Sequence, residues 1–417
     1  MDSMRRVKLG DVARVEISGV DKKMTAGETS VRLCNFTDVY KYWAITTPMY
    51  DSFMVASANE REIEKFTLHR GQVAVTKDSE TRDDIGIPTY IADSFDDVLL
   101  GYHCALITPD ESQLDGKYLN AFLHTEFIQK FFSANASGSG QRYTLSIETL
   151  NSIPLYLPSL AEQERIGSIF SSIDRKIEVN RQINDYLEAM SRQLYDFWFV
   201  QFDFPDSNGK PYKSSGGKMV WNKKLKRDIP EGWLNGQLID IANITMGQSP
   251  DGTSYNSEGN GVLFYQGSTD FGIRFPSVRQ YTTAPTRFAK KGDILMSVRA
   301  PVGAMNIANN DCCIGRGLAA LNPKMGSTTH LYYIIQDFKA AFDNRNSVGT
   351  TFGSITKDEL HSMPVIFPDK KTIALFESIC KPFFDKQMLI GKEIIELTSE
   401  RECLLPILMN GQASLCR

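Results

Sequence analysis

The sequence TLNSIPLYLP at residues 149–158 aligns without gaps on ELHSMPVIFP at residues 359–368, a constant offset of 210. In each stretch two prolines bracket a few strand-favouring residues, which predicts a short strand with fixed ends. The same offset continues for about forty residues downstream. Ile166 falls on Phe376 and Leu187 on Leu397, so apolar residues keep the same helical phase in both stretches. The chain therefore contains one structural unit twice.

The match extends upstream with gaps. LGDVARV at 9–15 corresponds to LIDIANI at 238–244, GQVAVT at 71–76 to GDILMS at 292–297, and Gly101 with Pro109 to Gly315 with Pro323. A unit of about two hundred residues is far longer than a solenoid or propeller repeat. We interpret the period as two duplicated domains.

Each copy combines predicted strands with a predicted helix. In the first copy, β-branched and aromatic residues between Gly, Asp and Pro predict strands at 31–36, 72–76 and 98–108, and apolar residues at helical spacing predict a helix at 118–132. The second copy repeats this order, with a helix at 332–342. Polar loops, SGSG at 137–140 and VGTTFG at 348–353, precede the two proline-bracketed strands.

Each copy ends in a predicted helix of about forty residues, 160–199 and 370–409. Apolar residues there recur in steps of three and four, the pattern of a coiled-coil seam. They are Ile166, Ile169, Ile173, Ile183, Leu187, Met190, Leu194 and Phe197 in the first helix, and Phe376, Ile379, Phe383, Ile390, Leu397 and Leu404 in the second. Asn180 and Asn184 interrupt the first stripe near its middle. The predicted fold class is α+β, with two similar α/β domains separated by two long helices that pack as an antiparallel coiled coil with pseudo-twofold symmetry.

These patterns predict five segments: a domain at 1–158, a helix at 159–200, a linker at 201–232, a second domain at 233–368 and a second helix at 369–411. The linker holds seven Lys and Arg residues between 210 and 227 and no acidic residue there. We expect a solvated linker. Attraction to a phosphate backbone is the alternative.

Composition indicates an ordinary soluble globular protein, with 42% apolar and 23% charged residues among 417. The sequence shows no secretion signal and no apolar run long enough for a bilayer, and its seven cysteines form no C-x-x-C motif. We expect a reduced, cytoplasmic protein. The net charge of −4 disfavours nucleic-acid binding by overall charge but permits a local basic face.

The motifs of common enzymes are missing from the sequence. It has no phosphate-binding G-x-x-x-x-G-K-[ST] loop and no glycine-rich fingerprint for a dinucleotide or S-adenosylmethionine, and its five histidines lack metal-ligand spacing. The short pattern from Pro109-Asp110 to Lys117 is better explained by turn chemistry than by a nuclease site. We expect no catalytic residue and no metal ligand.

One connected series of motifs resembles a known family. QRYTL at 141–145, IPLYLP at 153–158, EQ-x-RI at 162–166, ID-x-KI at 173–177 and N-x-x-IN at 180–184 are similar to the region after a target-recognition domain in specificity subunits of type I restriction-modification systems. The resemblance covers essentially the whole chain. The second copy departs from it, because DKKTI at 369–373 stands where the first copy has SLAEQ at 159–163, so the EQ-x-RI motif is missing there.

The resemblance implies a non-catalytic DNA-binding subunit. Each target-recognition domain would read one half of a bipartite double-stranded DNA target, and the helices would set the spacing. Two modification (methyltransferase) subunits would dock on the helices and carry S-adenosylmethionine, and restriction (motor-nuclease) subunits would join. No cofactor is expected on this chain, and no membrane partner.

Loops that differ between the copies are the best candidates for sequence readout, because the two half-sites would differ. Within these loops, Arg and Gln side chains suit guanine and adenine edges. The candidates are Lys77, Arg82, Gln141, Arg142 and Tyr143 in the first copy, and Gln248, Ser249, Gln266, Arg274, Arg299, Thr350 and Thr351 in the second. Each of them is alternatively a turn residue or a phosphate contact. We expect Glu162, Gln163 and Arg165 to face outward and dock a modification subunit.

Two other functions remain open on the sequence alone. The chain is alternatively the recognition arm detached from a single-chain methyltransferase-nuclease, or a coiled-coil adaptor that does not bind DNA. A steep dependence of DNA binding on salt, with a preference for one sequence, would separate a DNA reader from both.

Overall fold

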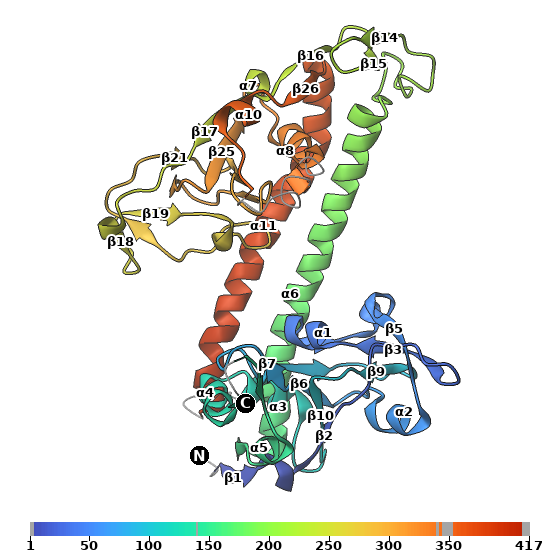
Figure 1. Ribbon diagram of the computed structural model, residues 1–417, viewed down its shortest axis with the longest axis vertical. Helices are drawn as coiled ribbons and strands as arrows, with labels where there is room; N and C mark the ends of the chain where they lie inside the picture. Colours follow the sequence, from blue (N-terminus) through green and yellow to red (C-terminus); the bar gives the residue numbers. More distant parts are fainter. Residues whose placement is uncertain (1–3, 139–140, 339–341, 344–352, 411–417) are drawn as a thin grey trace. The chain divides into compact units, whose positions relative to one another are not determined.

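The structure is a computed structural model that describes residues 4–138, 141–338, 342–343 and 353–410 (Figure 1). The chain divides into two compact units, Met1–Val179 with Ile395–Arg417, and Asn180–Ile394. Two long helices, α6 (Leu160–Tyr195) and α11 (Lys370–Met409), each contribute one part to each unit. Every unit is therefore one copy of the duplicated domain together with a stretch of both helices.

The first unit is built on a five-stranded sheet in the order β2-β10-β6-β8-β4 and a three-stranded sheet in the order β5-β3-β9. The strands are β2 (Ala13–Ile17), β3 (Thr29–Cys34), β4 (Ala44–Ile45), β5 (Met54–Ala58), β6 (Val73–Thr76), β8 (Pro88–Ile91), β9 (Val98–Leu100) and β10 (Cys104–Pro109). The helices α1 (Phe36–Lys41) and α2 (Glu60–Phe66) belong to the same region. The single strand predicted at 98–108 is thus two strands, because the backbone turns at His103, whose φ is 72°.

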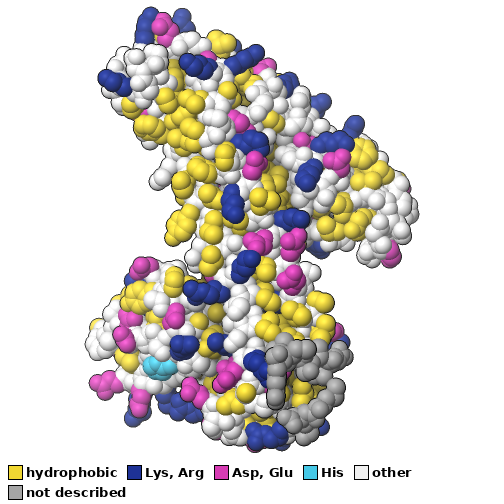
Figure 2. Space-filling view, turned by 180° about the vertical axis from the view of Figure 1, so that it is seen from behind, with side chains coloured by type: hydrophobic (Ala, Val, Ile, Leu, Met, Phe, Trp, Pro, Cys, Tyr) yellow, Lys and Arg dark blue, Asp and Glu magenta, His cyan; other side chains and the backbone are white. Residues whose placement is uncertain are grey.

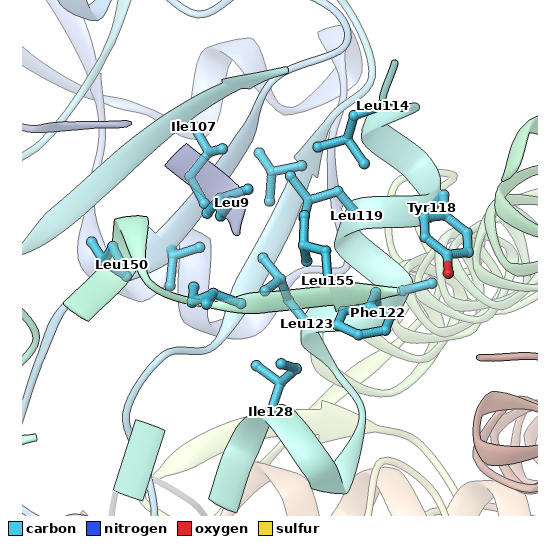
Figure 3. Packing of buried hydrophobic residues seen from close by; sticks show 14 of the residues in the cluster. Leu9, Ile107, Leu114, Tyr118, Leu119, Phe122, Leu123, Ile128, Leu150 and Leu155 are labelled. Carbon is cyan, nitrogen blue, oxygen red and sulfur yellow. The ribbon is translucent and has the colours of Figure 1, made fainter. Parts of the chain in front are cut away.

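The helix predicted at 118–132 is also divided, into α3 (Gly116–Leu123) and α4 (Glu126–Asn135). Thr125 between them is extended, and its hydroxyl donates to the Phe122 carbonyl at 2.7 Å, which replaces the helical hydrogen bond that would have continued α3. Both helices contribute apolar side chains to the core cluster that also contains Ile107 of β10, and Figure 3 shows Leu119, Leu123 and Ile128 around Leu155 in this cluster.

The main sheet of the second unit follows the strand order of the first with one strand fewer, whereas its second sheet is larger. Its main sheet runs β17-β25-β22-β23 and a second sheet runs β18-β20-β19-β24-β21. The strands are β17 (Ala242–Met246), β18 (Tyr255–Asn256), β19 (Val262–Tyr265), β20 (Tyr281–Thr282), β21 (Phe288–Ala289), β22 (Ile294–Ser297), β23 (Met305–Ile307), β24 (Cys312–Ile314) and β25 (Leu318–Pro323). Helices α7 (Leu238–Ile241), α8 (Thr328–Asp337) and α10 (Lys357–His361) complete it.

The registers of the two copies agree. Pro109 pairs with Ala13 in the first unit as Pro323 pairs with Ala242 in the second. The proline-bracketed strands β13 (Pro154–Leu157) and β26 (Pro364–Phe367) each pair antiparallel with the first strand of their own copy, β1 (Arg5–Lys8) and β16 (Leu234–Gln237). The prediction of two similar α/β domains is confirmed.

The long helices run antiparallel inside each unit. In the first, Asp174 of α6 forms an ion pair with Arg401 of α11 at 3.6 Å, and earlier residues of α6 share a core cluster with Leu405 and Leu408. In the second, the Gln387 side chain donates to the Asn184 carbonyl at 3.1 Å, and the Tyr195 and Phe376 rings lie 6.3 Å apart. The numbering rises along one helix as it falls along the other, as predicted.

Part of the predicted seam is wrong. Ile183 and Met190 of α6, Phe197 just after its end and Ile379 of α11 are exposed, whereas Asn180, Asn184 and Ser191 are buried. The Asn180 amide donates to Glu393 at 3.0 Å, and the backbone carbonyl of Asn184 accepts from the Gln387 side chain, so both positions face α11. Ile183 and Met190 are therefore wrong as seam residues, whereas Asn180 and Asn184, which interrupt the predicted stripe, lie on the seam. Leu187 and Leu194 of the predicted seam are half-buried.

The segment predicted as a linker is folded. After α6 a π-helical turn at Asp196–Val200 leads into a hairpin of β14 (Met219–Asn222) and β15 (Arg227–Pro230). Phe202, Phe204 and Ile229 are buried in the core of the second unit, and the Phe204 ring stacks on Trp233 at 4.8 Å. Burial of these large side chains explains why the segment is ordered despite its lysines.

Candidate nucleic-acid interface

The five candidate residues of the first copy lie together at one end of strand β6. The short strand β7 (Asp78–Ser79) follows β6 directly and pairs with β12 (Tyr143–Thr144), which pairs in turn with β11 (Ser137–Gly138). This small sheet brings the loop after β6, with Lys77, beside the segment that carries Arg142. We call the residues Lys77, Asp78, Arg82, His103, Gln141, Arg142 and Tyr143 the polar edge of the first copy.

Asp78 is the centre of this edge. Its carboxylate forms an ion pair with Lys77 at 2.8 Å, contacts His103 Nδ1 at 2.5 Å and lies 3.5 Å from Arg142 Nη2. Burial alone would raise the pKa of Asp78, but hydrogen bonds from Lys77, Thr144 and His103 and the charge of Lys77 outweigh burial, so its pKa is below the ordinary value. The carboxylate is thus ionised at neutral pH and holds three donor side chains around it.

The remaining members of the edge point toward solvent. The Arg142 side chain is 58% exposed, although its Nη2 also lies 2.9 Å from His103 Nε2. The Arg82 guanidinium lies over the Tyr143 ring, 5.0 Å from its centroid, and Gln141 is exposed beside them. Arg142 is therefore positioned by Asp78 and His103 while its guanidinium stays accessible, an arrangement that suits a guanidinium that recognises an external acceptor.

The second copy has an edge at the same place in the fold. Arg299 bridges to Ser354 as Asp78 pairs with Thr144, and the Ile355 N–H donates to the Val298 carbonyl at 3.0 Å as Leu145 donates to Lys77 at 2.8 Å. Thr350 and Thr351, which were predicted to belong here, lie outside the described residues. The equivalent positions Asp78 and Arg299 carry opposite charges.

Three more predicted residues surround the loop Gly315–Gly317 in the second copy. Ser249 Oγ accepts from the Arg316 N–H at 3.2 Å, the Gln248 N–H donates to the Ile314 carbonyl at 3.0 Å, and the Gln266 carbonyl accepts from the Gly317 N–H at 3.2 Å. The Val298 N–H donates to the Gly317 carbonyl at 2.9 Å, which brings Arg299 to the same place. We call Gln248, Ser249, Gln266, Arg299, Arg316 and Ser354 the polar edge of the second copy.

Arg274 does not belong to this edge, so its prediction needs correction. Its side chain is 10% exposed and forms an ion pair with Glu188 of α6 at 3.2 Å and a hydrogen bond with Gln387 of α11 at 2.9 Å. Its guanidinium also packs over the rings of Tyr332 and Phe384, at 5.2 and 4.9 Å. These contacts occupy Arg274 in joining the domain to the helices.

Of the three predicted docking residues, one is buried and the other two form an ion pair on α6. Gln163 is buried, with 1% of its surface exposed. Its Nε2 donates to the carbonyls of Gln113 and Pro158, and its Oε1 accepts from the Asp115 N–H. The expectation that Gln163 faces outward is wrong, because these backbone groups surround it. Glu162 forms an ion pair with Arg165, which is half-exposed, so this pair remains on the surface of α6.

Asp78, His103 and Arg316 were missed as members of the edges. The repeat itself contained the signal for two of them: His103 and Arg316 follow Gly101 and Gly315, which the alignment of the copies pairs. Asp78 could not be predicted from the sequence, because an acidic residue is not expected on a surface that binds phosphate. Only the structure shows that its carboxylate holds the side chains of Lys77 and Arg142.

Within the described part of the chain, no three His, Cys, Asp or Glu side chains are grouped so that they could hold a metal ion. No helix of that part has the length and apolar character needed to cross a membrane. On the face seen in Figure 2, Lys and Arg alternate with Asp and Glu, so the basic residues of this face form small groups within a mixed surface.

Comparison with known proteins identifies the family. The family model described as type I restriction modification DNA specificity domain matches residues 1–189 and 230–398. The MjaX specificity subunit of Methanocaldococcus jannaschii, assigned to a type I restriction enzyme, is 30% identical over 324 residues, which are 76% of this chain and 72% of the relative. The HindI type I restriction enzyme specificity subunit of Haemophilus influenzae is 20% identical over 401 residues, 80% of this chain and 85% of the relative.

A solved structure agrees with the fold. The crystal structure of the type I restriction-modification system S subunit from M. genitalium has a TM-score of 0.57 at 16% identity and covers 98% of this chain and 96% of its own. The two matched segments of the family model correspond to the two copies found in the sequence and in the fold. The chain belongs to the family of type I restriction-modification DNA specificity proteins.

Proposed function

We propose that the chain is the DNA-reading subunit of a type I restriction-modification complex and that each copy reads one half of a bipartite target through its polar edge. The observation that carries the proposal is the pair of equivalent edges. They share backbone register but differ in side chains, with Asp78 in one copy where Arg299 stands in the other. Two readers with one scaffold and different chemistry suit a target whose halves have different sequences.

Arg142 and Arg299 are the proposed base readers. Arg299 is exposed, and no carboxylate of the described residues forms an ion pair with it. A free guanidinium can form two parallel hydrogen bonds to O6 and N7 of guanine. In the first copy Asp78 and His103 fix the direction of Arg142, which lowers the entropy lost when it binds. The Arg82–Tyr143 pair and Gln141 beside it offer further donors and an aromatic face.

The helices α6 and α11 would set the spacing between the half-sites and dock two modification subunits, with restriction subunits joining the complex. The exposed Arg165, which pairs with the partly buried Glu162, and the exposed apolar residues of α6, such as Ile183 and Met190, support docking on these helices. In this proposal the methyl donor and the chemistry belong to the modification subunits, and this chain supplies recognition alone.

The test begins by identifying the target. Mapping N6-methyladenine across the genomes of cells with and without this chain should reveal a split motif that disappears when the chain is deleted. Binding of the purified chain to duplexes that vary one half-site at a time then assigns each half to a copy. Failure to find any such motif, together with equal binding to all duplexes, would overturn the proposal.

Substitutions then test the readers. Arg299→Ala should lose about 1–3 kcal/mol of discrimination, or roughly 5- to 150-fold, at one base pair of one half-site only. Arg142→Ala should do the same in the other half-site. Lys324→Ala is the matched control, because it removes the same charge next to Pro323, at the end of β25 opposite to the edge. Weakening that is uniform over all sequences would reassign either arginine to the phosphate backbone.

A further inference from the structure

The hairpin between α6 and the second copy presents a concentrated positive charge on a chain whose net charge is −4. We define the basic hairpin as β14, β15 and the turn between them. The turn carries Lys223, Lys224 and Lys226, all exposed, and no ion pair joins any of the three to a carboxylate of the described residues. Lys and Arg side chains are visible at the upper end of the second unit in Figure 2 as well.

The turn has a defined conformation. Asn222 Oδ1 accepts from the Lys224 and Leu225 N–H groups at 3.1 and 3.0 Å, and Lys226 adopts a left-handed backbone with φ of 51°. Four residue pairs join the two strands, and Ile229 of β15 is buried in the core of the unit. The lysines are thus displayed from an anchored element, so little backbone entropy is lost when they bind a ligand.

Three carboxylates of the segment 201–232 are engaged by other groups. Asp203 accepts hydrogen bonds from the N–H and hydroxyl of Ser214 at 2.7 and 2.6 Å, and Asp206 accepts from the backbone of Asn208 and Lys210 at 2.7 and 2.9 Å. Glu231 pairs with Lys218 at 2.5 Å, and Asp228 is the exposed carboxylate of the hairpin. The tip of the hairpin therefore keeps its positive charge.

An aromatic side chain accompanies the charge. Trp221 on β14 is 58% exposed. Such exposure is unusual, because tryptophan side chains are largely buried on average. Lysines beside an exposed aromatic ring form a surface suited to nucleic acid, where ammonium groups meet phosphates and the ring packs on sugar or base. An acidic protein surface is the competing ligand, and the exposed ring favours nucleic acid because it can pack on a sugar or a base.

We propose that the basic hairpin binds the phosphate backbone of duplex DNA outside the two half-sites and adds affinity without reading sequence. This inference rests on the proposed function, since it requires that the chain binds a duplex. Three ammonium groups on phosphates would release about three counterions. The slope of log K against log salt concentration would then change by roughly 0.9 for each contact.

The experiment compares the full chain with the triple variant Lys223→Gln, Lys224→Gln, Lys226→Asn on a target duplex and on an unrelated duplex of the same length. Asn is chosen at 226 because it tolerates the left-handed backbone. Lys370→Gln, Lys371→Gln, Lys386→Gln is the matched control, since it removes three exposed charges from α11 in the same unit. Binding is measured from 50 to 200 mM salt.

The hairpin variant should bind both duplexes more weakly by the same factor, and its salt slope should fall by about 2–3. Over this fourfold change in salt its affinity should therefore fall roughly 16- to 60-fold less than that of the wild type. The ratio between target and unrelated duplex should stay unchanged. Affinity and slope equal to those of the control would overturn the proposal. Loss of a co-purifying subunit with unchanged DNA binding would also overturn it, and would identify an acidic protein as the ligand. If the wild type shows no sequence ratio, the proposed function fails instead, so the two failures are distinguishable.

Discussion

Replacing Gln163 by Leu is expected to destabilise the first unit rather than to alter a docking surface. Leu has a similar volume and keeps the packing, but it removes three hydrogen bonds to buried backbone groups: those to the Gln113 and Pro158 carbonyls, at 3.1 and 3.0 Å, and that from the Asp115 N–H, at 3.1 Å. At about 1 kcal/mol for each bond the free energy of unfolding should fall by roughly 3 kcal/mol. For a unit of about two hundred residues this lowers Tm by about 6–12 °C.

The assay is thermal and urea unfolding followed by circular dichroism, with Glu164→Leu as the control. Glu164 is the next residue of the helix and is exposed, so its replacement should change stability by no more than about 0.5 kcal/mol. Equal Tm values for the two variants would refute the reasoning. If Gln163→Leu kept full stability but no longer co-purified with a modification subunit, the residue would be a docking residue after all.

Two further predictions concern charged groups. Asp78→Asn should cost about 1–3 kcal/mol at pH 7, because the ionised carboxylate holds Lys77 and His103. The pKa of Asp78 is lower in the folded protein than its ordinary value of 3.8, so the ionised carboxylate stabilises the fold above that value and loses this effect as pH falls below it. Urea titrations should therefore show the difference in unfolding free energy between wild type and variant closing below about pH 4. A difference independent of pH would contradict this. Glu162→Lys should reduce co-purification with a modification subunit, and the double reversal Glu162→Arg, Arg165→Glu, which keeps the intrahelical pair, should reduce it too. Recovery in the double variant would mean that the pair only stabilises the helix.

Most of the fold could be predicted from the sequence because the two copies align, at a constant offset from residue 149 onward and with gaps before it. Strands of the two copies that were aligned by residue type also share hydrogen-bond register, as in the pairings of Pro109 and Pro323. The second half of α6 could not be predicted in the same way. There Asn180, Asn184 and Ser191 are buried, whereas Ile183 and Met190, which an apolar pattern assigns to the seam, are exposed.

Candidate site residues could be predicted from the sequence where they follow a strand that both copies share. They could not be predicted where tertiary packing determines whether a side chain is exposed. Lys77 and Arg299 follow equivalent strands and were found. Arg274 was predicted to read DNA, and only the fold shows that its guanidinium is bound by Glu188 and Gln387 of the long helices. Gln163 likewise reads as a surface residue of a helix until the surrounding carbonyls are located.

The way in which Arg274 joins its domain to the helices limits how such proteins can exchange parts. In the second unit Arg274 belongs to the domain, whereas Glu188 and Gln387 belong to α6 and α11, and Gln336 of the domain also donates to Glu188 at 3.1 Å. A recombination event that replaced only the segment between the helices would leave Glu188 without its cation unless the incoming domain brought a basic residue to the same place. New specificities acquired by such shuffling should therefore carry this arginine with them, or be accompanied by a compensating change at position 188.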